Sequence, residues 1–280
     1  MNNSHNKDKN FLCYVLSIFM AVFLLVGCTK VDESSKSLVE KKSNKSQKII
    51  VLAAASLTES FNDIGKNLKK DKNIEASFNF AGSQQLVSLI EQDVNADVFV
   101  SADNKNMNKV IDEKKVSKSV IFTKNELVIG KYKKSSASVN SLKDLAKPGI
   151  KIIVGDKSVP CGAYFYKALQ KALQDKTIDK AEHDKILANI KSNELNVKDI
   201  VSKVNLGEAD VGIVYKTDIN KKNKDKIQII EDREFSKLKV EYPIAVINVS
   251  KNKKAAQEFI NYVTSTKGKS ILKSYGFSVE

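Results

Sequence analysis

The stretch KIIVLAAASLTESFNDIGKNLKK, residues 48–70, decides the fold of this chain. Its first part, Lys48–Ser56, is an apolar run suited to a strand that is buried in a sheet. In the second part, Leu57–Lys70, apolar side chains recur at helical spacing on one side: Leu57, Phe61, Ile64 and Leu68. A buried strand followed at once by an amphipathic helix predicts a sheet covered by helices.

The same alternation of strand and helix continues downstream. Ile74–Phe80 alternates like a strand, and Gln84–Glu91 returns to the helical period. Asp97–Ser101 is a third short strand, and the helix after it runs to about Lys115. Three strands that alternate with helices favour a mostly parallel sheet flanked by helices.

A change of pattern indicates a second lobe. ELVIGK at Glu126–Lys131 can carry the chain out of the first sheet, and EYPIAVINV at Glu241–Val249 can bring it back. Between them we expect helices over 141–147, 161–174 and 196–205, a Lys-rich helical segment ending near 190, and strands over 151–155, 209–215 and 227–231. Helices over 253–275 then close the first lobe. The sequence therefore predicts an α/β protein with lobe 1 at residues 48–126 and 246–280 and lobe 2 at 127–245.

The N-terminal segment carries an export signal. A polar, lysine-containing start precedes the apolar run FLCYVLSIFMAVFLLV and a small-residue site, which are the parts of a secretory signal peptide. The run is also close to the minimum length for crossing a bilayer, so a single membrane span is the alternative. Leu25–Cys28, LVGC, resembles the lipobox of bacterial lipoproteins. This resemblance implies a signal peptide over residues 1–27 and a Cys28 that is diacylated, which gives durable anchoring.

Residues 28–47 are rich in Ser, Lys, Asn and Glu and lack hydrophobic periodicity, so we expect a flexible tether. The predicted location is the cell membrane, with the protein lipid-anchored on its extracytoplasmic face. Cys13 would leave with the signal peptide and Cys28 would carry lipid. Cys161 then stands alone, and no intramolecular disulfide is expected in the mature protein.

The net charge of +14 does not indicate a nucleic-acid partner. Arg233 is the only arginine, whereas base and phosphate readers favour the planar, bidentate guanidinium group. The lysines alternate with Asp and Glu along predicted helices. This pattern is typical of a solvated surface with a general attraction to anionic lipid or cell wall.

The sequence lacks the parts of common enzymes. Its two histidines are His5, within the predicted signal peptide, and His183, on a charged helix face. No HExxH, GxSxG or GxxxxGK[ST] pattern is present, and no spacing of Asp and Glu predicts a metal site. We therefore expect a binding protein without catalytic residues or cofactors.

Small residues at predicted helix starts suggest a binding site for an anion. Ser56 with Glu59 has the spacing of a capping box, and Ser83 and Cys161 stand at two further helix starts. Helix N-termini offer unpaired N–H groups and the positive end of the helix dipole. Each serine could instead be only a cap, and Tyr215 only a buried sheet residue. The residues alone predict a two-lobed α/β binding protein with an anion site.

A family resemblance makes this prediction specific. The chain resembles the molybdate-binding proteins of ABC transporters from Lys48 to Phe277. The matching segments, in the order and at the spacing of that family, are residues 48–70, 80–103, 159–169, 207–218, 241–247 and 274–277. The resemblance implies a periplasmic-binding-protein fold of type II, in which each lobe is a mixed, mostly parallel sheet flanked by helices and the lobes close by a hinge.

The resemblance also implies the ligands of the oxyanion. They are the hydroxyl groups of two serines and a tyrosine and two main-chain amides: Ser56, Ser83, Tyr215, Cys161 and Val197. The match of Val197 rests on its spacing to Tyr215. Where the family more often has alanine, this chain has Cys161, whose thiol is either a small buried hydrophobe or an oxidisable group beside the ligand.

The implied function is capture of molybdate or tungstate by a monomer that delivers the ion to an ABC permease in the membrane. Hinge closure would be the state that the permease recognises. Binding of another small oxyanion, such as sulfate or phosphate, on the same fold is the alternative.

Overall fold

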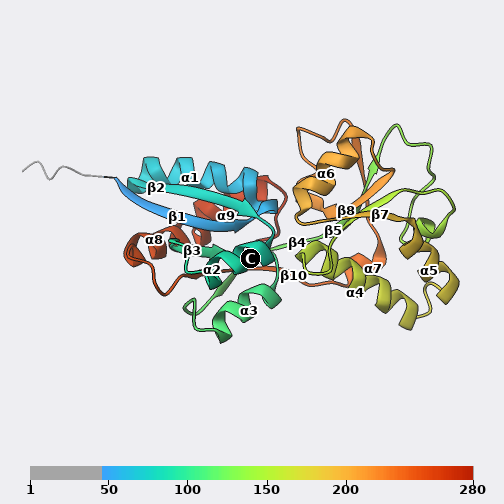
Figure 1. The fold of residues 1–280 in the computed structure, drawn as a ribbon. Helices are drawn as coiled ribbons and strands as arrows, with labels where there is room; N and C mark the ends of the chain where they lie inside the picture. Colours follow the sequence, from blue (N-terminus) through green and yellow to red (C-terminus); the bar gives the residue numbers. More distant parts are fainter. Residues whose placement is uncertain (1–45, 280) are drawn as a thin grey trace, which may run out of the picture. The chain divides into compact units, whose positions relative to one another are not determined.

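The computed structural model describes residues 46–279. The predicted signal peptide, the Cys28 lipidation site and all but the last two residues of the predicted tether lie outside the described residues. Within the described part, no helix is long and apolar enough to cross a membrane. Two five-stranded sheets, each flanked by helices, form this part of the chain (Figure 1).

The sheet of the first lobe has the strand order β2-β1-β3-β10-β4. Its strands are β1 (Gln47–Ala54), β2 (Ile74–Ala81), β3 (Val98–Val100), β4 (Val120–Asn125) and β10 (Val240–Val246). β1 pairs in parallel with β2 and β3, and β10 runs antiparallel to β3 and β4. Four strands therefore point the same way. The last four residues of β1 are buried, as the apolar run in the sequence predicts.

The sheet of the second lobe repeats this plan with the order β7-β6-β8-β5-β9. Its strands are β5 (Leu127–Tyr132), β6 (Ile152–Gly155), β7 (Ile190–Glu194), β8 (Val211–Tyr215) and β9 (Ile227–Ile230). β6 pairs in parallel with β7 and β8, and β5 runs antiparallel to β8 and β9. In each sheet the reversed strand is the one that enters from the other lobe.

Helices follow most of the strands. The first lobe contains the 3-10 turn η1 (Ala55–Leu57) and helices α1 (Thr58–Lys72), α2 (Ser83–Glu91), α3 (Asn104–Asp112), α8 (Lys253–Thr264) and α9 (Thr266–Ser274). The second lobe contains η2 (Lys143–Ala146), α4 (Pro160–Gln174), α5 (Lys180–Asn189), α6 (Val197–Leu206), η3 (Lys216–Asp218) and α7 (Arg233–Ser236). The side chains of Asp103, Asp179 and Asn196 cap α3, α5 and α6 by accepting a main-chain N–H.

Two strand connections join the lobes. β4 ends at Asn125 and β5 begins at Leu127, so the chain leaves the first sheet there. It returns at Val240, which pairs with Asn125, and not at the predicted residue 246. All of β10 pairs within the first sheet. Apolar alternation located this strand, but it cannot show which sheet a strand joins.

The predicted two-lobed α/β fold with mixed, mostly parallel sheets is confirmed. Two strands were not predicted. β7, IKSNE, is a polar edge strand whose residues are only partly covered, and β4 begins with the exposed residues Val120 and Ile121. Edge strands bury little surface, so their sequences show weak hydrophobic periodicity.

A cluster of phenylalanines holds α1 and α8 to the first sheet. The ring of Phe61 on α1 lies 5.9 Å from those of Phe78 and Phe122 and 5.7 Å from that of Phe259. Phe61 is fully buried. Aromatic side chains bury more surface than other apolar residues, so this cluster fixes α1 relative to β2, β4 and α8.

We expect Phe61→Ala to lower the free energy of unfolding by about 3–5 kcal/mol, because it leaves a cavity among the three neighbouring rings. Equilibrium unfolding in guanidinium chloride measures this change. Val249→Ala is the control, since the side chain of Val249 is 60% exposed and its removal should change stability by less than about 0.5 kcal/mol. Equal effects of the two substitutions would contradict the assignment of the core.

Candidate functional site

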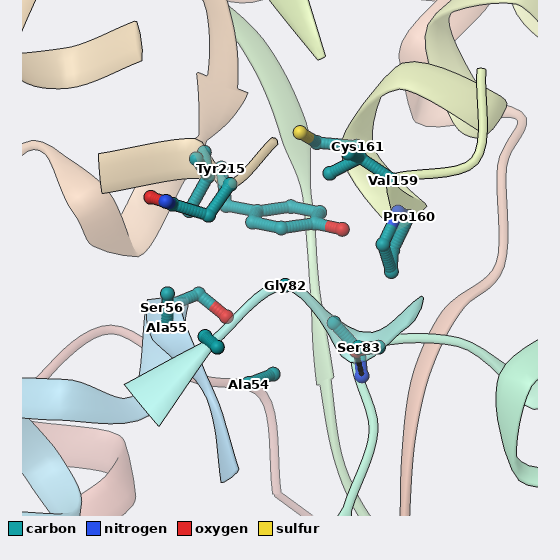
Figure 2. A pocket seen from close by; sticks show the side chains of 13 residues that line it. Ala54, Ala55, Ser56, Gly82, Ser83, Val159, Pro160, Cys161 and Tyr215 are labelled. Atoms are coloured by element: carbon teal, nitrogen blue, oxygen red, sulfur yellow. Dashed lines mark hydrogen bonds between the residues drawn. The ribbon is translucent and has the colours of Figure 1, made fainter. Parts of the chain in front are cut away.

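A small cavity of about 20 Å³ lies where elements of both lobes meet. All five residues predicted to bind an anion line it (Figure 2). The lining residues are Ala54, Ala55, Ser56, Ala81, Gly82, Ser83, Ala102, Val159, Pro160, Cys161, Asn196, Val197 and Tyr215. A space of this size suits a few atoms, as in a small inorganic ion, and excludes a large organic ligand.

Three α-helices begin at the cavity. Ser83 and Val197 are the first residues of α2 and α6, and Cys161 is the second residue of α4. The first N–H groups of a helix have no partner within it, and the dipole makes this end positive. The cavity is therefore surrounded by main-chain donors that favour negative charge.

The predicted capping box of Ser56 and Glu59 is wrong. The turn η1 lies between β1 and α1, so α1 begins at Thr58 and has no side-chain cap. The Ser56 hydroxyl instead lies 2.9 Å from the hydroxyl of Tyr242, and Glu59 forms an ion pair with Lys198 at 2.8 Å. Ser56 is thus released from helix capping and is available to the cavity.

Ser83 is not a cap either, because Gly82 occupies the N-cap position of α2. Its Oγ accepts a hydrogen bond from the main-chain N–H of Ala102 at 3.0 Å. A hydroxyl has one proton to donate, and that of Ser83 is not used in this bond. Ser83 is only 1% exposed and lines the cavity, so its hydroxyl can donate this proton to a group inside the cavity.

Tyr215 is the last residue of β8 and is 1% exposed. Figure 2 shows its ring crossing the cavity, with the hydroxyl toward Pro160. Within residues 46–279 this hydroxyl has no hydrogen-bond partner. Burial raises the pKa of Tyr215 far above its usual value, so the group keeps its proton. An unpaired buried donor is costly, which indicates a place for an acceptor.

No charged side chain is among the described residues that line the cavity. The nearby cation Lys198 is ion-paired with Glu59 at 2.8 Å and with the fully buried Asp218 at 3.2 Å. Partial burial opposes its charge, but the two carboxylates outweigh this and raise the pKa of Lys198. Its charge is neutralised within this cluster, which also joins α1 to α6.

A second contact between the lobes lies at the start of α2. Gln84 Nε2 donates to the carbonyl oxygen of Leu195 at 2.8 Å. The backbone approaches closely at this point, because a Cβ on Gly82 would lie 2.3 Å from the same oxygen. Glycine at residue 82 therefore allows the two lobes to meet at the cavity.

The Cys161 side chain is buried, and Figure 2 shows its sulfur directed away from Ser56 and Ser83. Burial first, and then the charge of Asp218, raises the pKa of this thiol. A protonated, enclosed thiol is unreactive. The sequence left two interpretations of the Cys161 thiol, a small buried hydrophobe or an oxidisable group beside the ligand. These observations favour the first.

Sequence reasoning missed two residues that support the site, Tyr242 and Asn125. Tyr242 contacts Ser56 across 186 positions of sequence, and Asn125 contacts Tyr242 across 117. No local spacing signals such contacts. Tyr242 lies within the segment EYPIAVI, whose alternation indicates only a strand.

The fold and this cavity are those of a solute-binding protein with two lobes. Residues 49–278 match the family described as bacterial extracellular solute-binding protein, and the chain belongs to this family. The family is a class of transport proteins.

Several individual proteins are similar to the chain, and their names point to ABC transporters and to molybdate. The chain is 33% identical to a protein of Bacillus subtilis named as an ABC transporter substrate-binding lipoprotein, over 94% of this chain and 98% of that one. It is 32% identical to the molybdate-binding protein ModA of Escherichia coli, over 83% and 90%. A solved structure described as the substrate-binding domain of a molybdenum ABC transporter from Clostridium difficile is 33% identical, with a TM-score of 0.61 and coverage of 84% and 100%. The resemblance to molybdate-binding proteins inferred from the sequence is confirmed.

We expect the Cys161 thiol to resist alkylation by iodoacetamide in the folded protein, because it is enclosed and protonated. The measurement is peptide mapping after timed alkylation of the full chain, with and without denaturant. Labelling of the Cys161 peptide should require denaturant. Native labelling as fast as that of a small-molecule thiol would show that the group is open to solvent.

Proposed function

We propose that this protein captures molybdate, and tungstate with it, in the cavity between its lobes and delivers the ion to the permease of an ABC importer. The observation that carries the proposal is a buried, uncharged cavity surrounded by hydrogen-bond donors. The confirmed resemblance to molybdate-binding proteins supports the choice of ion.

In this proposal five groups hold the oxyanion. Ser56, Ser83 and Tyr215 donate from their hydroxyls, and Cys161 and Val197 donate from main-chain amides at helix starts. Fixed donors act strongly where water is excluded, so a dianion needs no lysine or arginine beside it. The protein needs no cofactor and performs no catalysis in this role.

Delivery depends on where the protein is held. A lipid-anchored monomer, attached through Cys28 on the extracytoplasmic face, would present the loaded lobes to the permease. The lipobox-like sequence and the lipoprotein name of the Bacillus subtilis relative support the anchor. The contacts of Glu59 with Lys198 and of Gln84 with Leu195 join the lobes, so they would stabilise the closed state that a permease could recognise.

Sulfate is the second candidate ligand, because neutral donors around a small cavity suit any tetrahedral dianion. Selectivity would then come from size. Sulfate is smaller than molybdate and would leave some of the donors poorly paired, whereas tungstate is nearly identical in size to molybdate. Phosphate keeps a proton near neutral pH, and the donor-lined cavity offers little to accept it.

Isothermal titration calorimetry of the full chain in detergent micelles tests the proposal. Sodium molybdate and sodium tungstate should each bind one to one, and sodium sulfate should give no heat above dilution. If sulfate bound and neither molybdate nor tungstate did, the assigned fold would still hold but the proposed ligand would be wrong.

We expect Ser83→Ala and Tyr215→Phe each to weaken molybdate binding by about 1–3 kcal/mol, because each removes one donor and leaves an anion oxygen unpaired in a buried site. The same titration measures the loss. Ser88→Ala and Tyr166→Phe are matched controls on α2 and α4, since both side chains bond to groups outside the cavity. Unchanged affinity in Ser83→Ala and Tyr215→Phe would remove both residues from the ligand set.

A further inference from the structure

A chain of buried hydrogen bonds leads from the connection between the lobes to the cavity. It runs from Asn125, at the end of β4, through Tyr242 on β10 to Ser56. Asn125 also reaches Thr217 in the second lobe. All four side chains are less than a tenth exposed, and of the four only Ser56 lines the cavity.

The direction of these bonds is fixed at the Asn125 end. The main-chain N–H of Glu126 donates to Asn125 Oδ1 at 2.9 Å, which identifies that atom as the acceptor. Asn125 Nδ2 must therefore be the donor on the other side. It donates to Thr217 Oγ1 at 2.8 Å and to the hydroxyl oxygen of Tyr242 at 3.2 Å.

The direction is then passed on to Ser56. Because the Tyr242 oxygen accepts from Asn125, its own proton is free for Ser56 Oγ, 2.9 Å away. Burial raises the pKa of Tyr242 far above its usual value, so this proton is retained. Ser56 accepts from Tyr242, and its single proton is left for the cavity that it lines.

We propose that Asn125 and Tyr242 are positioning residues that fix Ser56 as a hydrogen-bond donor to the bound oxyanion. The inference rests on the proposed function and adds to it a cause of specificity. Ser83 likewise accepts a hydrogen bond from the N–H of Ala102 and keeps its own proton for the cavity. Tyr215 also keeps its proton, because burial raises its pKa. Each of the three hydroxyls thus keeps its single proton for the cavity, which favours an oxyanion whose oxygens all act as acceptors.

We call the chain of hydrogen bonds from Asn125 through Tyr242 to Ser56 the relay. Asn125→Asp tests the direction of its hydrogen bonds, because the substitution hardly changes the shape of the side chain. An aspartate at residue 125 accepts where Asn125 Nδ2 donates, so Tyr242 turns its proton toward the carboxylate and Ser56 must donate to Tyr242. Ser56 then presents a lone pair to the ligand. Molybdate affinity should fall about tenfold to a hundredfold. The ratio of phosphate to molybdate affinity should rise, because the cavity gains an acceptor for the proton of hydrogenphosphate.

Tyr242→Phe provides a second test that adds no charge. It should weaken molybdate binding about three- to tenfold, because Ser56 loses the partner that orients its proton. In a Ser56→Ala background the same substitution should not weaken molybdate binding further, because the hydroxyl that Tyr242 orients is already absent. Tyr262→Phe is the control, as its hydroxyl bonds to Asp71 away from the cavity.

Titration calorimetry of the full chain in detergent micelles gives all these affinities, and guanidinium unfolding of each variant checks that it folds. A loss from Tyr242→Phe that is equal with and without Ser56 would overturn the relay, as would unchanged molybdate affinity in Asn125→Asp and Tyr242→Phe. In both cases binding by the wild-type chain would leave the proposed function standing. A wild-type chain that binds no tetrahedral oxyanion would overturn both.

Discussion

Negative charge can be held in a water-excluded cavity without a cation only if several polar groups point to one place, and the rest of this structure serves that requirement. The parallel strands β1 and β2 end at the cavity, the segments that follow β6 and β7 reach it at Val159 and Asn196, and β8 lies beside β6. Helical turns that begin at the ends of four of these strands bring N–H groups inward, and β8 ends on Tyr215. The carboxyl ends of parallel strands are the general place for ligands in α/β sheets, because helix N-termini meet there.

Close approach of backbones is the second condition, and glycine meets it at two points. A Cβ on Gly162, in the first turn of α4, would lie 2.1 Å from the carbonyl oxygen of Asp156, so α4 could not begin so near β6 with any other residue. Gly82 does the same between the lobes. Donors that are fixed by packed backbone would need little reorganisation to hold the proposed ion, which makes neutral dipoles effective.

The sequence predicted those features that depend on local periodicity. The strand and helix over residues 48–70 were predicted because a buried strand and an amphipathic helix each leave a clear pattern. The helix predicted over 196–205 was found in the same way and lies within one residue of α6 at each end. The role of Ser56 as a cap was not predictable, because one 3-10 turn shifts the start of α1. β7 was missed because a polar edge strand lacks the pattern. The bonds of Tyr242 depend on tertiary packing and leave no trace in spacing.

Lys198 shows why the high positive charge of the chain does not decide the chemistry of the cavity. It follows Val197 directly, yet its ammonium group is held by Glu59 and Asp218. A free lysine at the cavity would attract anions of any shape and protonation state. With that charge neutralised, recognition depends on the direction and spacing of donors. A wrong ligand then leaves a buried donor unpaired, and such a group costs about 1–3 kcal/mol. In the proposed function, discrimination between oxyanions would therefore come from the penalty for a poor fit more than from the strength of attraction.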